Sequence, residues 1–525
     1  MKEIKALKIE ELTLEQKIGM LDAAYIARHY DPEELEYVFD LIRNRSLGAV
    51  WIQIGVKGGD ELIAKVKEIA DYPILIITDA ESGIGEYKIG RHNALGCTGS
   101  EAHAYAFGKA TAITARKMGY NVVCDPVLDL RNDGSPRSYG SSKEEIARLA
   151  AAEARGFHDG GILTVAKHYP SGNNPKKVDT HMAEGYSEQT AEELYETGLY
   201  AYRMLIKEGL LDGIMAGHHR FVNIDDAHPA SLSKSVIDII RNDGFDGFFI
   251  TDALGMMGII GKFGKEESKG LAIAAGNDLA LTYTPEPRFN HEALITCYKN
   301  GIYSEERLNE GVRHVLRAQA KTLALPKYTE LTEEDIAISK SINADAIYER
   351  VDEGVPPSIS KEGKHLFALM VRNESNIGSE GRVEVDTFSS AWLFPSELTK
   401  KIEESFPNST VIAYHQFPSS PQNCRILSDS VDYDDLIFIT FAEPIAYTGR
   451  EHITRRVETL INAAQSNGKV STLIHFGNPC VLDNLPHIPR IIIGGLAKDA
   501  TLAAVDILSG ERKAVGRLTY DAKIN

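Results

Sequence analysis

Ionisable side chains stand at the ends of several short apolar runs of the sequence. The run 247–251 ends at Asp252, and the run 163–166 is followed by Lys167 and His168. Other runs lead into Asp79, Asp125, Asp129, His218 and His219. In a barrel of parallel strands the carboxyl ends converge on one face, where catalytic groups sit. Strand ends are also where chains become polar, but this many ionisable residues favours a catalytic site, with carboxylate and imidazole as its reactive groups.

A second chemical pattern is Asp179-Thr180-His181, which follows Lys167 and His168 by about a dozen residues. A nearby carboxylate fixes the tautomer of an imidazole and raises its basicity, and imidazole titrates near neutral pH. Alone, an Asp-x-His pattern in a polar loop is more often solvated surface. Its position after Lys167 and His168 favours proton transfer by His181.

The residues between about 14 and 325 alternate strand-like runs with amphipathic helical patterns, which predicts a TIM-type (β/α)8 barrel. A less clear first strand lies near 18–23. The clearer runs, rich in branched residues as buried parallel strands are, span 48–54, 73–79, 121–127, 163–168, 213–217, 247–252 and 278–282. Serine caps predict two of the helices, one beginning at 141–143 and ending before Gly160, the other beginning at 231–233.

The pattern changes after residue 330, which predicts a second domain. We place the catalytic barrel at 1–330, a linker with a helix at 331–355, and an α/β (αβα) sandwich at 356–525. Five runs predict a parallel sheet with helices on both faces, at 366–371, 409–414, 436–441, 471–476 and 490–494. The sequence has no GxGxxG or Walker loop there, so nucleotide binding has no support.

Several motifs together resemble glycoside hydrolase family 3, and specifically its β-N-acetylhexosaminidase (NagZ-like) branch. The segment 249–257 is similar to the catalytic strand of that family, and 167–174 to its KHFPGHGD segment. Asp179-Thr180-His181 is similar to the branch's Asp-Ser-His motif. Further matches, which extend the resemblance over nearly the whole chain, are 230–233, 275–279, 476–479 and 516–518.

This resemblance implies a retaining glycosidase, which needs a carboxylate nucleophile and a group that protonates the leaving oxygen. It implies Asp252 as the nucleophile, His181 as the acid/base and Asp179 as the partner of His181. It also carries four residues into sugar binding: Asp79, Arg137, Lys167 and His168. For Arg137 and Lys167 the alternative is a structural ion pair at the rim of the barrel. With both catalytic candidates in the first domain, we expect a mostly structural role for the second.

Three departures from the family pattern put the details of the substrate in question. Ser82 breaks the glycine pair after Asp79, and the Arg expected about eight residues after that Asp is absent; Lys88 stands near its place without the planar fork of Arg. The segment 171–174 differs from Gly-His-Gly-Asp, and the loop continues through 175–177. The third departure is His218-His219-Arg220, where the family more often has a single His.

The leading expectation is an exo-acting β-N-acetylglucosaminidase that removes a terminal N-acetylglucosamine from a small carbohydrate, for example a muropeptide-derived cell-wall fragment. A close alternative is a β-N-acetylglucosaminide or β-glucoside phosphorylase with the same residues, because a neutral or cationic His tolerates an incoming anion better than a carboxylate would. A third possibility is that the enzyme acts on another hexose. An alternative from another functional class is a catalytically weakened protein that only binds sugar. An aldolase is disfavoured, because Lys167 is the single strand-end lysine.

Composition limits the remaining function classes. With 57 basic and 75 acidic residues the chain carries a net charge of −18, which argues against a nucleic-acid partner or an anionic membrane surface. No run approaches the length of a membrane span, and the charged start lacks the apolar core of a secretory signal. Five scattered cysteines predict free thiols in a reducing, cytoplasmic location. We expect no cofactor and no metal.

Overall fold

The computed structural model describes residues 4–27, 31–172, 178–326, 330–371, 374–377, 383–386, 395–442 and 452–520. Side chains within 374–386 are not described. The segment 173–177, part of the departure noted in the acid/base loop, lies outside the described residues. All five cysteines are free thiols. No helix in the described ranges combines the length and apolarity that a bilayer crossing requires.

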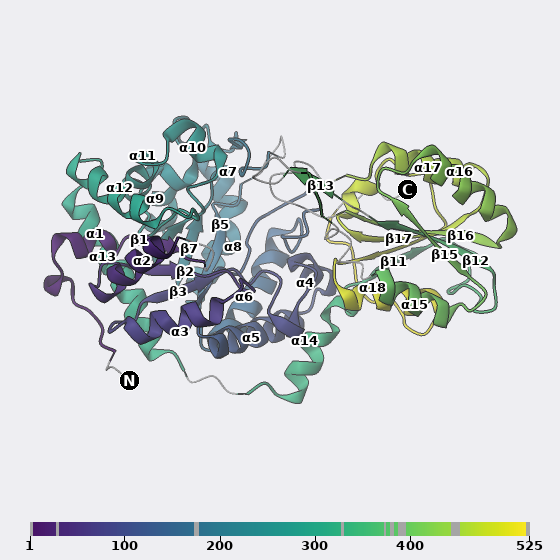
Figure 1. Ribbon diagram of the computed structural model, residues 1–525, viewed down its shortest axis with the longest axis horizontal. Helices are drawn as coiled ribbons and strands as arrows, with labels where there is room; N and C mark the ends of the chain where they lie inside the picture. Colours follow the sequence, from purple (N-terminus) through teal and green to yellow (C-terminus); the bar gives the residue numbers. More distant parts are fainter. Residues whose placement is uncertain are drawn as a thin grey trace.

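The first domain is the expected barrel of eight parallel strands (Figure 1). In sheet order the strands are β10 (Ala280–Leu281), β1 (Asp22–Tyr25), β2 (Ala49–Trp51), β3 (Leu75–Thr78), β4 (Val122–Val123), β5 (Leu163–Tyr169), β7 (Gly213–Ala216) and β9 (Phe248–Thr251). A parallel bridge between Ile250 and Leu279 closes the ring. The first strand begins later than the expected 18–23, because helix α1 (Leu14–Gly19) takes the first two of those residues.

Helices surround the barrel and bury the outer faces of its strands. They are α2 (Pro32–Arg43), α3 (Gly59–Ile69), α4 (His92–Thr98), α5 (Glu101–Met118), α6 (Lys143–Asp159), α7 (Ala191–Glu196), α8 (Gly198–Lys207), α9 (Lys234–Asn242), α10 (Met257–Phe263), α11 (Glu267–Ala275), α12 (Pro287–Lys299) and α13 (Glu305–Ala324). The two predicted serine caps are confirmed, since the side chain of Ser142 caps α6 and that of Ser233 caps α9.

Helices α5 and α6 pack at unusually close range, because each has a glycine at the contact. A Cβ on Gly108 would lie 2.2 Å from the carbonyl oxygen of Glu153, and a Cβ on Gly156 would lie 2.2 Å from that of Tyr105. No larger residue fits at such distances. The two glycines therefore fix the position of α6, and with it the inward-pointing side chain of Glu153, which is completely buried.

The second domain is an α/β sandwich, as expected, with a six-stranded sheet. Its order is β11 (Tyr348–Val351), β18 (Arg490–Gly494), β17 (Val470–Gly477), β16 (Asp435–Ala442), β12 (His365–Val371) and β15 (Thr410–His415). Helices α16 (Ser420–Asp429) and α17 (Arg455–Ser466) lie on one face, and α15 (Pro395–Ser405) and α18 (Lys498–Ser509) on the other (Figure 1). All five predicted strands are present; the sequence analysis missed β11, an antiparallel edge strand.

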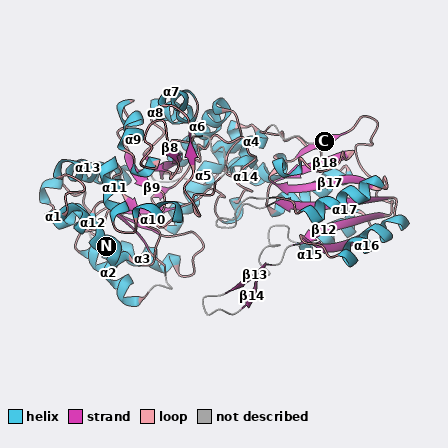
Figure 2. Cartoon of the chain, turned by 90° about the horizontal axis from the view of Figure 1, so that it is seen from above, coloured by secondary structure: helices cyan, strands magenta, loops and turns pink. Residues whose placement is uncertain are grey.

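A small two-stranded ribbon, β13 (Glu374–Ile377) and β14 (Val383–Asp386), stands apart from this sheet (Figure 2). Helix α14 (Glu333–Asp345) precedes β11 and falls inside the segment predicted to be a helical linker. Its Asn343 accepts a hydrogen bond from the backbone N–H of Gly90 and donates one to the carbonyl of Lys88, both at 2.9 Å. The boundaries at 330 and 355 stay predictions.

The second domain is also hydrogen-bonded to the loops that follow barrel strands. The Tyr520 hydroxyl donates to the carbonyl of Ser135 at 2.6 Å. The Asn478 amide donates to the carbonyl of Asp133 at 3.2 Å. Ser135 and Asp133 belong to the loop after β4, on the carboxyl-terminal face of the barrel. The second domain therefore helps to shape the same face on which the strand-end residues gather.

Candidate active site

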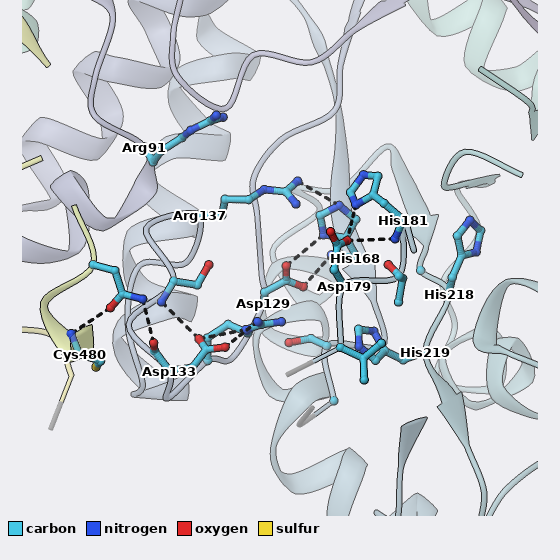
Figure 3. A pocket seen from close by; sticks show the side chains of 18 of the residues that line it. Arg91, Asp129, Asp133, Arg137, His168, Asp179, His181, His218, His219 and Cys480 are labelled. Atoms are coloured by element: carbon cyan, nitrogen blue, oxygen red, sulfur yellow. Dashed lines mark hydrogen bonds and ion pairs between the residues drawn. The ribbon is translucent and has the colours of Figure 1, made fainter. Parts of the chain in front are cut away.

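A cleft of about 710 Å³ opens between the carboxyl ends of the barrel strands and two loops of the second domain (Figure 3). From the barrel, its charged and imidazole-bearing wall residues are Glu81, Arg91, Asp129, Arg131, Asp133, Arg137, His168, Asp179, His181, His218, His219 and Asp252. The second domain adds His452, Ile453, Glu458, Asn478, Cys480, Val481, Asp483 and Asn484. These eight residues give the second domain a larger part in the cleft than the mostly structural role expected from the sequence.

Asp252 follows the seventh barrel strand, where the backbone is held on both sides. Its N–H donates to the carbonyl of Ala216 on the neighbouring strand at 2.9 Å, and its carboxylate accepts from the N–H of Ala253 at 2.7 Å. Burial alone raises the pKa of Asp252, but His218 and His168, the Ala253 N–H and Arg137 outweigh burial and hold it below its ordinary value. Asp252 is therefore an ionised carboxylate at neutral pH, fixed on a rigid element.

His218 supports the backbone beside Asp252. Its Nε2 lies 3.0 Å from the carbonyl oxygen of Ala253, and its Nδ1 lies 2.8 Å from the hydroxyl of Ser231. Because a carbonyl can only accept, Nε2 carries the hydrogen and the Ser231 hydroxyl donates to Nδ1. Burial lowers the pKa of His218, so that this neutral tautomer is favoured at neutral pH.

Asp179 and His181 form the pair that their spacing in the sequence suggested. One carboxylate oxygen of Asp179 accepts from the backbone N–H of His181 at 3.0 Å and lies 2.7 Å from its Nδ1. Since an ionised carboxylate only accepts, Nδ1 carries the hydrogen in the neutral ring, and Nε2 is the basic nitrogen. Both residues line the same cleft as Asp252 (Figure 3).

The loop that carries this pair rests on the first turn of helix α10, a few residues after Asp252. The N–H of Met257 donates to the carbonyl of His181 at 3.1 Å, and that of Gly258 to the carbonyl of Thr180 at 3.3 Å. A Cβ on Gly258 would lie 2.7 Å from the Thr180 oxygen and 2.8 Å from the Ala183 oxygen. The lack of a side chain at Gly258 therefore lets the loop approach the Asp252 segment.

The residues expected to bind sugar form one continuous charged network, centred on Glu81. Arg137 makes a two-point pair with Glu81, at 2.9 and 2.5 Å. Lys167 donates to Asp79 at 2.5 Å and to Glu81 at 2.7 Å. Burial would raise the pKa of Glu81, but Arg137 and Lys167 hold it well below its usual value. The ion-pair alternative considered for Arg137 and Lys167 is therefore present in the structure.

The same four residues differ in their access to the cleft. Arg137 and His168 line it, whereas Lys167 is buried and, like Asp79, is not part of its wall. His168 is held at both ring nitrogens: Nδ1 lies 3.0 Å from the carboxylate of Asp129, and Nε2 lies 3.3 Å from the guanidinium of Arg137 (Figure 3). Arg137 and His168 thus face the cleft, whereas Lys167 lies behind them and is shared between Asp79 and Glu81.

The departure at Ser171 has a structural reason. Ser171 adopts a left-handed backbone with φ of 60°, a region that favours glycine. Its hydroxyl accepts from the N–H of Leu130 at 2.7 Å and donates to the carbonyl of Leu128 at 2.9 Å. These two bonds hold the residue between them, Asp129, against His168. A serine in place of the family's glycine therefore adds support to the cleft wall.

Glu81 and Arg91 are among the cleft residues that were not singled out from the sequence. Arg91 lies twelve residues after Asp79, with its guanidinium 3.6 Å from Glu81. Lys88, the cation nearest to the expected position, is exposed and is not part of the cleft wall. Arg91 therefore places a guanidinium in the cleft wall, which the sequence analysis did not expect because it looked for one about eight residues after Asp79. A sequence search that allowed four extra residues after Asp79 would have found it.

The backbone of Arg91 is itself unusual, with φ of 88° and ψ of 171°. Residues other than glycine rarely adopt this region, and each such residue costs on the order of 1–3 kcal/mol. Strain of this kind persists where the surroundings impose it, and it is enriched at ligand-binding sites. The next residue, His92, is completely buried, which anchors the strained residue from below.

Comparisons with known proteins identify the family of the chain. Residues 13–318 match the model of the glycosyl hydrolase family 3 N-terminal domain. A β-hexosaminidase from Tolumonas auensis is 29% identical over 269 residues, which cover 48% of this chain and 78% of that protein. A β-N-acetylglucosaminidase/β-glucosidase from Cellulomonas fimi is 25% identical over 346 residues, 62% of this chain and 60% of that protein.

Two solved structures share the fold over nearly the whole chain. A family 3 β-N-acetylglucosaminidase from Paenibacillus sp. str. FPU-7 has a TM-score of 0.81 at 23% identity, covering 98% of this chain and all of that one. The β-glucoside phosphorylase BglX has a TM-score of 0.80 at 21% identity, covering 98% and 95%. The family match spans more than half of the chain: this protein belongs to glycosyl hydrolase family 3 and is a glycosidase.

Proposed function

We propose that the protein is a retaining, exo-acting β-N-acetylglucosaminidase, with Asp252 as nucleophile and His181 as acid/base. The observation that carries the proposal is that an ionised, strand-held carboxylate and an aspartate-paired imidazole line one cleft. The names of the β-N-acetylglucosaminidases from Cellulomonas fimi and Paenibacillus support N-acetylglucosamine as the sugar. The substrate is then a small carbohydrate, and we favour a cytoplasmic, muropeptide-derived fragment that carries a terminal N-acetylglucosamine.

In the first step, the Asp252 carboxylate attacks the anomeric carbon while protonated His181 gives its Nε2 proton to the departing oxygen. Asp179 holds the ring of His181 in one orientation through the contact at Nδ1. In the second step, neutral His181 takes a proton from water, whose oxygen displaces Asp252 from the sugar. Two displacements at the same carbon leave the β configuration unchanged.

The sugar pocket is proposed to lie at the Glu81 network. Arg137 offers a donor at the cleft wall beside the ring of His168, and Glu81, which is itself paired with Lys167, holds Arg137 in place. Because Glu81 keeps Arg137 in a two-point pair, the guanidinium is presented in one orientation. Such fixed polar groups suit the hydroxyls of a pyranose ring.

A phosphorylase is the second candidate, on one specific observation. The proposed acid/base is an imidazole, and Arg91 and Arg131 line the same cleft, so that an incoming phosphate meets cations in place of a second carboxylate. The same residues would then transfer the sugar to phosphate and release a sugar 1-phosphate. The fold shared with a β-glucoside phosphorylase is compatible with either acceptor.

Replacing Asp252 tests the nucleophile. We expect Asp252→Asn to lower kcat by at least about a thousandfold, because the amide cannot form the glycosyl ester. Circular dichroism should stay native, and the exposed control Asp246→Asn should keep full activity. A 5-fluoro N-acetylglucosaminide should label the Asp252 peptide in the native chain, as mass spectrometry would show. Retained activity in the variant, or a product released in the α configuration by NMR, contradicts the mechanism.

Replacing His181 tests proton donation. We expect His181→Ala to slow alkyl N-acetylglucosaminides by about 10²–10⁴-fold, the usual size of acid–base catalysis. Aryl glycosides with acidic leaving groups need little protonation and should lose far less in the first step. The slope of log kcat/KM against leaving-group pKa measures this. Equal losses for both substrate classes would mean that His181 only positions the substrate.

The packing of the acid/base loop gives a third prediction, based on Gly258. A methyl group there collides with the carbonyls of Thr180 and Ala183, so Gly258→Ala should push His181 away from the cleft. We expect the leaving-group pattern of His181→Ala in milder form. Gly261→Ala, on the same helix with nothing near its Cβ, is the matched control and should behave like the native chain. Unchanged kinetics in Gly258→Ala would show that the loop tolerates the displacement.

One comparison distinguishes water from phosphate as the acceptor of the sugar. Turnover of aryl β-N-acetylglucosaminide, glucoside and xyloside is measured with and without inorganic phosphate, and the products are identified by NMR. A hydrolase releases free sugar at a rate that phosphate leaves unchanged. Accumulation of sugar 1-phosphate with a phosphate-dependent rate would replace the hydrolase proposal by the phosphorylase.

A further inference from the structure

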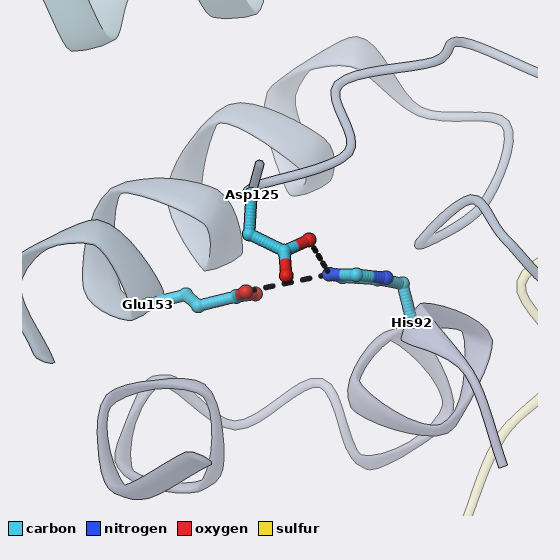
Figure 4. A group of neighbouring side chains, drawn as sticks. All are labelled: His92, Asp125 and Glu153. Carbon is cyan, nitrogen blue, oxygen red and sulfur yellow. Dashed lines mark hydrogen bonds and ion pairs between the residues drawn. The ribbon is translucent and has the colours of Figure 1, made fainter. Parts of the chain in front are cut away.

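Three side chains from separate elements meet below the cleft, outside the set of residues that line it (Figure 4). His92 is the first residue of α4, Asp125 follows strand β4, and Glu153 lies in the middle of α6. All three are completely buried. None of them has a part in the proposed glycosidase steps, so their convergence needs another explanation.

The spacing of the three ligand atoms is that of a metal site. His92 Nε2 lies 3.3 Å from an oxygen of Asp125 and 3.3 Å from an oxygen of Glu153. The three atoms all lie within 4.8 Å of one another. Zinc bonds to imidazole and carboxylate measure about 2.0–2.1 Å, so neighbouring ligands of a tetrahedral ion stand about 3.3 Å apart. A direct hydrogen bond would normally be shorter, close to 2.8 Å for a charged pair.

The charges of the cluster are not balanced by its own protons. Neither carboxylate oxygen of Asp125 has a hydrogen-bond partner among the described residues, although the group is completely buried. The single hydrogen on His92 Nε2 faces two carboxylates at equal distance and cannot serve both well. A protonated His92 offsets one of the two carboxylates, and the buried Lys167, whose charge also acts on Asp125, is already paired with Asp79 and Glu81. A divalent cation balances two carboxylates and accepts the lone pair of a neutral imidazole.

The surroundings hold the ligands as a metal site requires. The Tyr139 hydroxyl donates to the second oxygen of Glu153, which leaves the first to point at His92. The glycine contacts between α5 and α6 fix the helix that carries Glu153. Support of this kind from outside the ligand set orients metal ligands in proteins.

We propose that His92, Asp125 and Glu153 bind a structural divalent cation, Zn²⁺ foremost, through one imidazole nitrogen and two carboxylates. Two of the three segments that the ion joins also supply a cleft residue: Arg91 directly precedes His92, and Asp129 follows Asp125 by four residues. Tyr139, which donates to Glu153, stands two residues after the cleft residue Arg137. The cation thus holds the floor of the cleft, and this role is the same whichever acceptor the enzyme uses.

The primary test is the metal content of the purified chain, measured by inductively coupled plasma mass spectrometry. We expect close to one equivalent of Zn²⁺ in the native protein, and X-ray absorption at the zinc edge should show nitrogen and oxygen ligands without sulfur. His92→Gln and Glu153→Gln should each lose the metal. His487→Gln, at an exposed histidine, is the matched control and should keep it. Sulfur ligation, or metal retained in both cluster variants, overturns the proposal.

A second measurement does not depend on the variants folding. The native chain is unfolded in a denaturant that contains EDTA and is then refolded with or without zinc chloride. The midpoint of its thermal unfolding is recorded for both preparations. Zinc should raise the midpoint by several degrees, because an ion that binds only the folded state stabilises it. Less than a tenth of an equivalent of any metal as purified, with no shift for Zn²⁺ or Mn²⁺, means that the cluster holds only protons. Glycosidase specificity does not enter either measurement.

Discussion

The cleft depends on one buried carboxylate, that of Glu81. Burial makes its charge costly, and Arg137, Lys167 and, at longer range, Arg91 compensate for it. These cations come from the end of β5, the loop after β4 and the start of α4, so a single charge ties three segments together. Breaking such a buried pair costs about 3–5 kcal/mol, because it leaves an uncompensated charge. The network therefore sets the shape of the cleft wall as well as its charge.

The charged neighbours also give the two proposed reactive groups, Asp252 and His181, different surroundings. Asp252 has cationic and imidazole neighbours that favour its ionised form, whereas His181 is oriented by a carboxylate at Nδ1. The cleft thus holds one ionised carboxylate and one oriented imidazole, the two kinds of group that the proposed mechanism uses. This combination suits a retaining mechanism, in which the two groups must act in opposite senses.

The second domain completes the site without supplying either proposed reactive group. Asn478 donates to the carbonyl of Asp133, and Cys480 stands beside it in the cleft wall (Figure 3). A Cβ on Gly134 would lie 1.9 Å from the Asn478 side chain, so the barrel loop fits only because glycine stands there. The far wall of the cleft is therefore built from contacts between residues over 300 positions apart in the chain.

The sequence alone determined the barrel, the α/β sandwich and the strand-end position of Asp252, because repeated apolar runs and strand-end polarity are local patterns. It also paired Asp179 with His181, which are two residues apart. It did not identify Glu81 and Arg91 as cleft residues, the second-domain wall, or the His92–Asp125–Glu153 cluster. Those features arise where distant segments meet, and neither burial nor a charge partner can be read from a residue's neighbours in sequence. Apart from Arg91, which a looser spacing after Asp79 would have found, only tertiary packing decided them.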